Sequence, residues 1–147
     1  MTEPRYQSLT KENIPEVAFE SGKVWVIAGE FSGTKGPAKT FSPIELYDIR
    51  FEKAGKIKID LRDGDNTMML VPAGSAKVND KNITYSELVY FSQKGYSIEI
   101  SATENSKILV MSGTLLGQGV FNYGPFVMDN PTDLMRAFRD YNAGLLN

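Results

Sequence analysis

The chain has 147 residues, carries 16 basic and 18 acidic side chains for a formal net charge of −2, and contains neither histidine nor cysteine. Its 41% hydrophobic and 23% charged residues are typical of one globular domain with a hydrophobic core and exclude a largely disordered chain. Without cysteine there is no disulfide, thiolate zinc site or cysteine nucleophile. Without histidine the commonest metal ligand and general base are missing. The near-neutral charge argues against direct contact with nucleic acid.

Nothing in the sequence indicates export or membrane insertion. No apolar run approaches the roughly 18 residues that a membrane span needs. The first residues, MTEPRYQSL, lack the apolar core of a signal peptide. We therefore expect a cytoplasmic protein that does not contact a membrane.

Most of the chain has the pattern of short β-strands. An extended arm is expected over residues 1–20, and after it runs of β-branched and aromatic residues are separated by turn-forming residues. Ile57, Ile59 and Leu61 alternate with charged residues, which is typical of a half-buried strand. Further strands are expected at residues 24–28, 44–51, 68–71, 76–78, 88–91, 96–100 and 108–111. This pattern predicts an all-β sandwich or barrel.

The last part of the chain has a helical pattern instead. Asn130 is a suitable N-cap, and a proline follows it at the first helical position. Leu134, Phe138 and Tyr141 recur at the spacing of one helix face. We expect one α-helix over residues 131–143, docked on protein through this face, because three large apolar side chains left in water forfeit roughly 1.5–3 kcal/mol each.

Two loops contain residues that could carry chemistry, and each has a simpler interpretation. The segment GEFSGTKGPAKT, residues 29–40, could cradle a phosphate, but it departs from the P-loop spacing and is interpreted as an inter-strand loop. Asp60, Asp63 and Asp65 could hold calcium or magnesium through carboxylate oxygens. Their spacing is not that of an EF-hand, so a solvated turn is favoured.

Basic and aromatic residues are also predicted to be structural. One small basic cluster contains Arg50, Lys53, Lys56 and Lys58. It is narrower than a nucleic-acid site and is interpreted as a solvated strand face. Three aromatic residues that could stack on bases are Tyr90, Phe91 and Tyr96. In short strands such residues are more often core or cross-strand pairs.

The segment YGPFVMDNPTDLMRAFRDYNAG, residues 123–144, resembles the C-terminal signature of the pirin family. PRYQSL near the N-terminus, VWVIAGE with the glycine-rich loop, and TFSP resemble successive parts of the second half of a pirin, so the resemblance covers essentially the whole chain. Pirins are similar to two cupin barrels in tandem, and this chain resembles the second. The resemblance implies an all-β, cupin-type (RmlC-like) β-barrel or double-sheet jelly roll with a short C-terminal α-helix, formed by residues 1–147 as a single domain. It leaves open a natural half-protein, an internal-start product and a truncated piece.

The resemblance also indicates where cupin metal ligands would fall. Gly55 and Gly74 fit the glycine spacing of the first cupin motif, and Gly95 fits the glycine of the second. The ligand slots then fall on Leu61, Asp63, Thr67 and Ile98. One carboxylate cannot replace a four-ligand iron or manganese site. Family iron and quercetin-cleaving dioxygenase activity belong to the first barrel, so we expect no metal, no other cofactor and no dioxygenase activity here.

Three functions are compatible with these observations. The favoured one is a non-catalytic, metal-free module that acts in protein interaction or assembly. The first alternative is a barrel that binds a small apolar ligand, lined by Met68, Met69 and Met111. The second is an enzyme of unrecognised type that uses carboxylate, lysine or tyrosine groups.

The resemblance finally implies a partner. Removing the first barrel of a tandem pirin uncovers apolar surface, and a large contiguous apolar patch is uncommon on a stable monomer. We therefore expect a homodimer, or pairing with a separate metal-binding pirin N-terminal half. The predicted interface includes the arm at residues 6–9 together with Phe126, Met128, Leu134, Phe138 and Tyr141.

Overall fold

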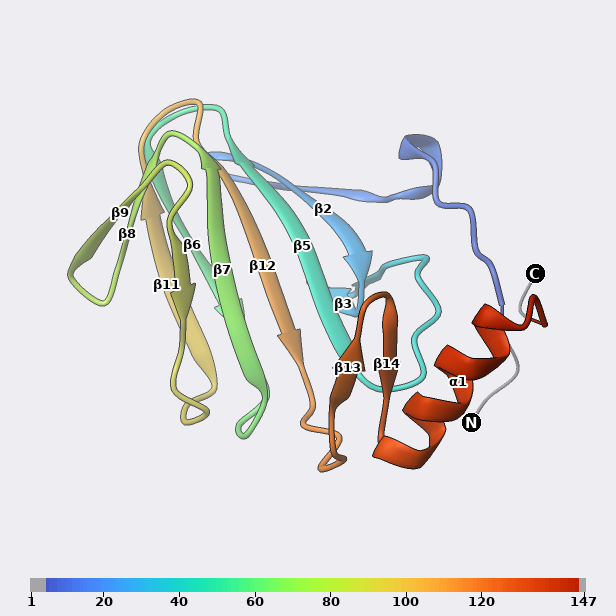
Figure 1. Ribbon diagram of the computed structural model, residues 1–147. Helices are drawn as coiled ribbons and strands as arrows, with labels where there is room; N and C mark the ends of the chain where they lie inside the picture. The colour runs from blue at the N-terminus through green and yellow to red at the C-terminus, as the bar shows by residue number, and fades with distance from the viewer. Residues whose placement is uncertain (1–4, 146–147) are drawn as a thin grey trace. The chain divides into compact units, whose positions relative to one another are not determined.

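The short apolar runs of the sequence form strands that pair antiparallel throughout residues 5–145, the part of the chain that the computed structural model describes (Figure 1). Contacts divide the chain into two units. The first ends at Leu115 and the second begins at Leu116. No helix within residues 5–145 is long and apolar enough to cross a membrane.

A six-stranded sheet with the order β1-β2-β5-β12-β7-β10 forms one layer of the first unit. Its strands are β1 (Glu16–Phe19), β2 (Gly22–Ala28), β5 (Ile44–Phe51), β12 (Lys107–Gly113), β7 (Asn66–Ala73) and β10 (Leu88–Tyr90). The expectation of an extended arm over residues 1–20 is wrong in part, because β1 and the 3-10 helix Lys11–Asn13 lie within it. β1 forms one edge of this sheet, and its residues Val17 and Phe19 pack against the core.

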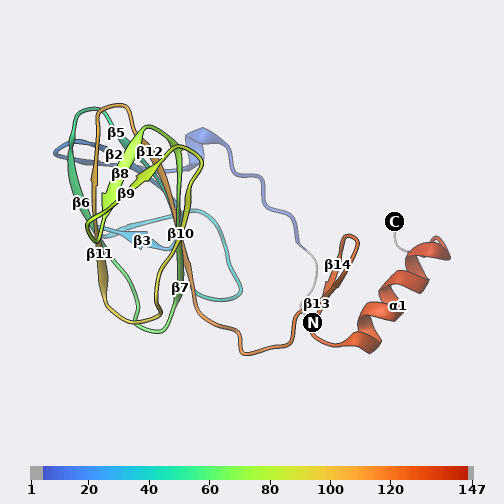
Figure 2. The same cartoon turned by 60° about the vertical axis from the view of Figure 1, so that its left-hand side comes forward.

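A four-stranded sheet with the order β6-β11-β8-β9 forms the other layer. Its strands are β6 (Gly55–Asp60), β11 (Ser97–Ala102), β8 (Ser75–Val78) and β9 (Lys81–Thr84). Figure 2 shows β6 and β11 on one side of this unit and β7 and β10 on the other. A short hairpin of β3 (Glu30–Phe31) and β4 (Thr34–Lys35) lies in the glycine-rich segment.

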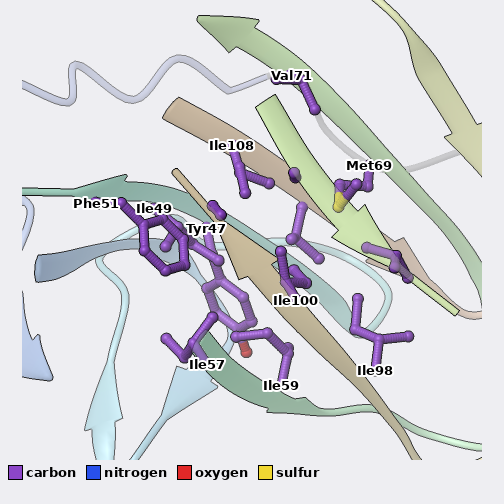
Figure 3. Packing of buried hydrophobic residues seen from close by; sticks show 14 of the residues in the cluster. Tyr47, Ile49, Phe51, Ile57, Ile59, Met69, Val71, Ile98, Ile100 and Ile108 are labelled. Atoms are coloured by element: carbon purple, nitrogen blue, oxygen red, sulfur yellow. The ribbon is translucent and has the colours of Figure 1, made fainter. Parts of the chain in front are cut away.

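The core fills the space between the two sheets. Because successive side chains of a strand point to opposite faces, alternate residues of each strand enter this core. Figure 3 shows Tyr47, Ile49, Phe51, Ile57, Ile59, Met69, Val71, Ile98, Ile100 and Ile108 packed together. Each of these side chains is less than 9% exposed. The interior of the barrel is therefore packed with side chains.

The second unit is a hairpin followed by the helix. The hairpin pairs β13 (Phe121–Tyr123) with β14 (Phe126–Met128), and α1 spans Pro131–Asn142, one residue shorter than predicted. Asn130 caps the helix as expected, since its side-chain oxygen accepts a hydrogen bond from the Asp133 amide at 2.8 Å. The helix contacts both strands of the hairpin.

Candidate functional site

Three of the four predicted ligand slots surround one small cavity at the end of the first unit's core. Leu61 follows β6, Thr67 lies in β7 and Ile98 lies in β11, and all three line a cavity of about 70 Å³. Asp63 is not part of this lining. Its carboxylate is exposed and accepts a hydrogen bond from the Gly95 amide at 2.8 Å. Three of the four slot residues therefore lie around one cavity, and Asp63 lies outside its lining.

The residues in these slots do not fit a transition metal. Leu61 and Ile98 present only carbon atoms, and Ile98 is buried. The Thr67 hydroxyl is buried and shares a hydrogen bond of 2.8 Å with the Ser112 hydroxyl. No group of three or more carboxylates close enough to hold a metal ion occurs within residues 5–145. The donor set that iron or manganese needs is thus missing from the place where the family would supply it.

Two of the polar residues that line the cavity, Arg62 and Asp65, form an ion pair that the sequence did not indicate. Asp65 is 5% exposed, and its carboxylate accepts hydrogen bonds from Arg62 Nε at 3.1 Å and from the Thr114 hydroxyl at 3.0 Å. Arg62 also lies 3.5 Å from the carboxylate of Glu45. The guanidinium therefore bridges two carboxylates and keeps the buried one compensated.

Glu45 connects this cluster to a buried tyrosine. The hydroxyl of Tyr47 lies against the Glu45 carboxylate and 2.8 Å from the carbonyl oxygen of Glu30. The amide of Glu30 donates to the same Glu45 carboxylate at 3.0 Å. Burial, and then the hydrogen bond to Glu45, raise the pKa of Tyr47 well above its usual value. Tyr47 therefore remains a neutral hydrogen-bond donor.

This network is suited to structure more than to acid–base catalysis. A general base needs a free lone pair within reach of a substrate. Glu45 already accepts from the Glu30 amide and the Tyr47 hydroxyl, while Asp65 accepts from Arg62 and Thr114. Both carboxylates are thus engaged within the protein, although each has about four lone-pair sites and keeps some of them unused. Sequence spacing gave no signal for the network, because its members come from separate strands and loops.

The aspartates at the end of β6 and in the turn after it have different surroundings. Asp60 is an exposed residue paired with Lys58 at 3.5 Å, and Asp63 is bound to the Gly95 amide. Asp65 is buried, so the expectation of a solvated turn is wrong for this residue. Because the carboxylates are held by different partners, they do not make a calcium or magnesium site.

The glycine-rich segment forms the β3–β4 hairpin and uses its amides internally. The Gly36 amide donates to the Gly29 carbonyl at 2.9 Å, and the Ala38 amide donates to the Ile27 carbonyl at 3.0 Å. Amides paired in this way do not cradle a phosphate. The inter-strand loop interpretation is confirmed.

The basic cluster is divided between the two sheets. Arg50 on β5 pairs with Asp48 at 2.7 Å, while Lys56 on β6 lies 3.5 Å from Glu99. Lys56 therefore lies on a solvated strand face as predicted, whereas Arg50 lies on the outward face of the other sheet, and both are neutralised by a carboxylate. Among the three aromatic residues, Phe91 packs against the core, while Tyr90 and Tyr96 are exposed.

The alternative of an apolar ligand inside the barrel loses its proposed lining. Met69 is buried in the core, whereas Met68 and Met111 are directly opposite each other on the outward face of the large sheet. Neighbouring residues of a strand point to opposite faces of the sheet. Because Met69 points into the core, Met68 and its cross-strand partner Met111 point away from the interior. The 70 Å³ cavity is also far below the roughly 300 Å³ of a typical ligand pocket.

Of the predicted interface, the arm at residues 6–9 belongs to the first unit, and the five single residues from Phe126 to Tyr141 lie in the second. Phe138 packs edge-on against Tyr123 with ring centroids 5.0 Å apart, and Tyr141 packs against Phe126 at 5.6 Å. Phe126, Met128, Leu134 and Phe138 are half-buried, and Tyr141 is exposed. The apolar face of the helix therefore meets the hairpin of its own unit.

Comparisons with known proteins agree with this architecture. A family model described as the pirin C-terminal cupin domain matches residues 46–147. A pirin-like protein of Caulobacter vibrioides is 31% identical over 147 residues, which cover 98% of this chain and 53% of that protein. The crystal structure of a quercetin 2,3-dioxygenase from Acinetobacter baumannii has a TM-score of 0.90 and 33% identity, over 95% of this chain and 50% of that one.

A more distant structure shows the fold alone. An RmlC-like cupin from Shewanella frigidimarina is 11% identical with a TM-score of 0.53, over 77% of this chain and 95% of that one. The two antiparallel sheets of the first unit are therefore those of a cupin jelly roll. The chain spans about half the length of the curated relatives it matches.

Proposed function

Because the chain belongs to the pirin family, through its C-terminal cupin domain, we propose that it is a non-catalytic cupin module that acts in protein interaction or assembly without a metal site. One observation carries this proposal. At the positions that the family resemblance assigns to cupin metal ligands, this chain has Leu61, Thr67 and Ile98 around a cavity of about 70 Å³. These side chains stabilise a core and cannot hold a redox metal.

The dioxygenase activity of a relative is not transferred to this chain. The Acinetobacter baumannii protein is described as a quercetin 2,3-dioxygenase, but this chain aligns with only 50% of it. A metal-dependent oxygenase of the cupin type needs histidine or carboxylate ligands that converge, and this sequence contains no histidine. Under the proposal, such chemistry requires a metal-binding barrel other than the one formed by these 147 residues.

The partner is either a second copy of this chain or a separate metal-binding pirin N-terminal half. Its contacts are with protein, because a net charge of −2 without a basic stripe gives nucleic acid little to bind. A cytoplasmic location remains a prediction from the sequence.

Metal analysis and an oxygenase assay test the proposal. The full chain is purified without chelator and analysed for iron, manganese, nickel and zinc, before and after incubation with each ion. We expect far less than one ion per chain and no loss of quercetin absorbance, with the Acinetobacter baumannii protein as the positive control. A stoichiometric ion would overturn the metal-free assignment, and its loss in Asp63→Asn, the only carboxylate in a slot, would place the ion at that slot. Quercetin cleavage by the purified chain would overturn the non-catalytic one.

A further inference from the structure

The outward face of the six-stranded sheet is apolar where a solvated sheet is usually polar. Antiparallel residues that lie directly opposite share one face. The register places Leu88 opposite Leu70, and Leu70 opposite Leu109, in one row across β10, β7 and β12. Core residues such as Met69 alternate with this row and point the other way. The row therefore lies on the outside of the jelly roll.

A second apolar row runs beside the first. It crosses the same strands and continues onto β5, with Tyr90 opposite Met68, Met68 opposite Met111, and Met111 opposite Leu46. At the β10 end the exposure is high: Leu88 is 58% exposed and Tyr90 61%. Unbranched methionine side chains adapt to an irregular partner surface, so a methionine pair in such a row is suited to contact.

The smaller sheet shows that this composition is particular to one face. Its outward residues are largely charged, and they include Lys56, Lys58, Asp60, Lys77 and Glu99. Lys56 and Glu99 lie 3.5 Å apart, as on an ordinary solvated strand surface. The same fold therefore has one polar face and one apolar face. Only the second has the composition of an interface core.

Most charges on the outward face lie in ion pairs. Lys23 lies 3.0 Å from the carboxylate of Glu16, while Lys107, opposite Arg50 at the start of β12, adds one positive charge. Arg50 lies 2.7 Å from the carboxylate of Asp48, and its guanidinium lies 4.4 Å from the centre of the Trp25 ring. The pair of Arg50 and Asp48 adds no net charge to the face. Two identical faces can therefore approach each other with little of the like-charge repulsion that a charged face would meet in its own copy.

The size of the face matches what a dimer needs. Six strands at about 4.8 Å spacing and roughly 23 Å length give a projected area of about 660 Å², and the four strands that carry the apolar rows account for about 440 Å² of it. The accessible area of a face covered by large side chains exceeds its projection. It therefore approaches the ~800 Å² per partner of a stable interface. An apolar patch of this extent is at the upper limit for a monomer.

From this face we infer that two copies of the chain pair through the outward surfaces of their six-stranded sheets, related by a two-fold axis. The inference rests on the proposed assembly role and names its partner and surface. Sheets that pack face to face align their strands within about 30°, and a two-fold contact uses the same patch twice. The centre of the strand order lies between β5 and β12, so the pair of Leu46 and Met111 lies close to the axis.

The test measures the mass of the full chain in solution by sedimentation at tens of micromolar. We expect the native chain at twice its 16.3 kDa. Met111→Lys and Met111→Glu should each sediment as monomers, because a charge buried at the axis faces its own copy. An equimolar mixture of the two should recover the dimer through opposite charges. Leu88→Lys, at a side chain already 58% exposed, should weaken the dimer at least tenfold without affecting the folded monomer.

Tyr96→Lys is the matched control, since Tyr96 is 74% exposed and lies outside the large sheet. It should leave the dimer intact, and far-ultraviolet circular dichroism should be native for every variant. If the native chain sediments as a monomer, the inference is wrong. This holds whether residues 116–145 or another protein would then cover the face. A dimer that survives both Met111→Lys and Leu88→Lys also overturns it. Neither result affects the metal-free assignment, which the metal analysis tests separately.

Discussion

Tyr47→Phe removes one hydroxyl from the most buried polar contact of the cluster and changes little else. Tyr47 is 1% exposed, and its ring packs edge-on against Phe31 with centroids 5.7 Å apart, a contact that phenylalanine preserves. The lost hydroxyl leaves the Glu45 carboxylate with the Glu30 amide at 3.0 Å and Arg62 at 3.5 Å. Hydrogen bonds to a charged group contribute about 1.5–3 kcal/mol, so we expect the free energy of unfolding to fall by that amount.

The assay is urea unfolding at fixed protein concentration, followed by the fluorescence of the single tryptophan and by circular dichroism. Tyr96→Phe is the control, because its side chain is 74% exposed, and should change the free energy of unfolding by less than about 0.5 kcal/mol. A loss below about 0.5 kcal/mol in Tyr47→Phe would refute the argument, because it would mean that the hydroxyl contributes nothing net.

The contact between Tyr47 and Glu45 also predicts that the free energy of unfolding depends on pH. The pKa of Tyr47 is raised in the folded state above its ordinary value of 10.0. The folded state therefore favours the neutral phenol. The resulting stabilisation of the folded state is fully present below about pH 10. Above it the unfolded chain loses the proton first, so stability falls as pH rises. The difference in free energy of unfolding between the native chain and Tyr47→Phe should therefore become smaller above pH 10. A difference that stays constant to pH 11 would contradict the assigned direction.

Two further substitutions test local packing. Phe138→Ala removes a half-buried ring from its edge contact with Tyr123, so we expect about 1–3 kcal/mol less protection of the helix amides in hydrogen exchange. Protection unchanged within about half a kcal/mol would mean that the helix is loosely attached. Gly74→Ala should cost about 2–5 kcal/mol in thermal unfolding, because Gly74 has φ +77° and a new Cβ would lie 2.7 Å from Cα of buried Ser106. Gly33→Ala, with φ +79° and open space, should cost only about 1 kcal/mol.

The strands and the helix could be predicted because their signals are local. Alternation at Ile57 and Ile59 places one side of β6 in the core, and the cap at Asn130 fixes the start of α1. The edge strand β1 was missed because only Val17 and Phe19 of its four residues pack on the core, which is too short a pattern to distinguish from an arm.

What the sequence by itself determined is the chemistry that this protein lacks and the order of its elements. A chain without histidine or cysteine lacks the imidazole and thiolate ligands of most transition-metal sites in any fold, whatever its contacts. Only the tertiary structure decided which side chains meet. Glu45, Arg62 and Asp65 come together because a strand and a separate turn converge at one end of the barrel. Likewise Met68 and Met111, 43 positions apart in the sequence, face outward together because register between paired strands, and not spacing along the chain, assigns each side chain to a face.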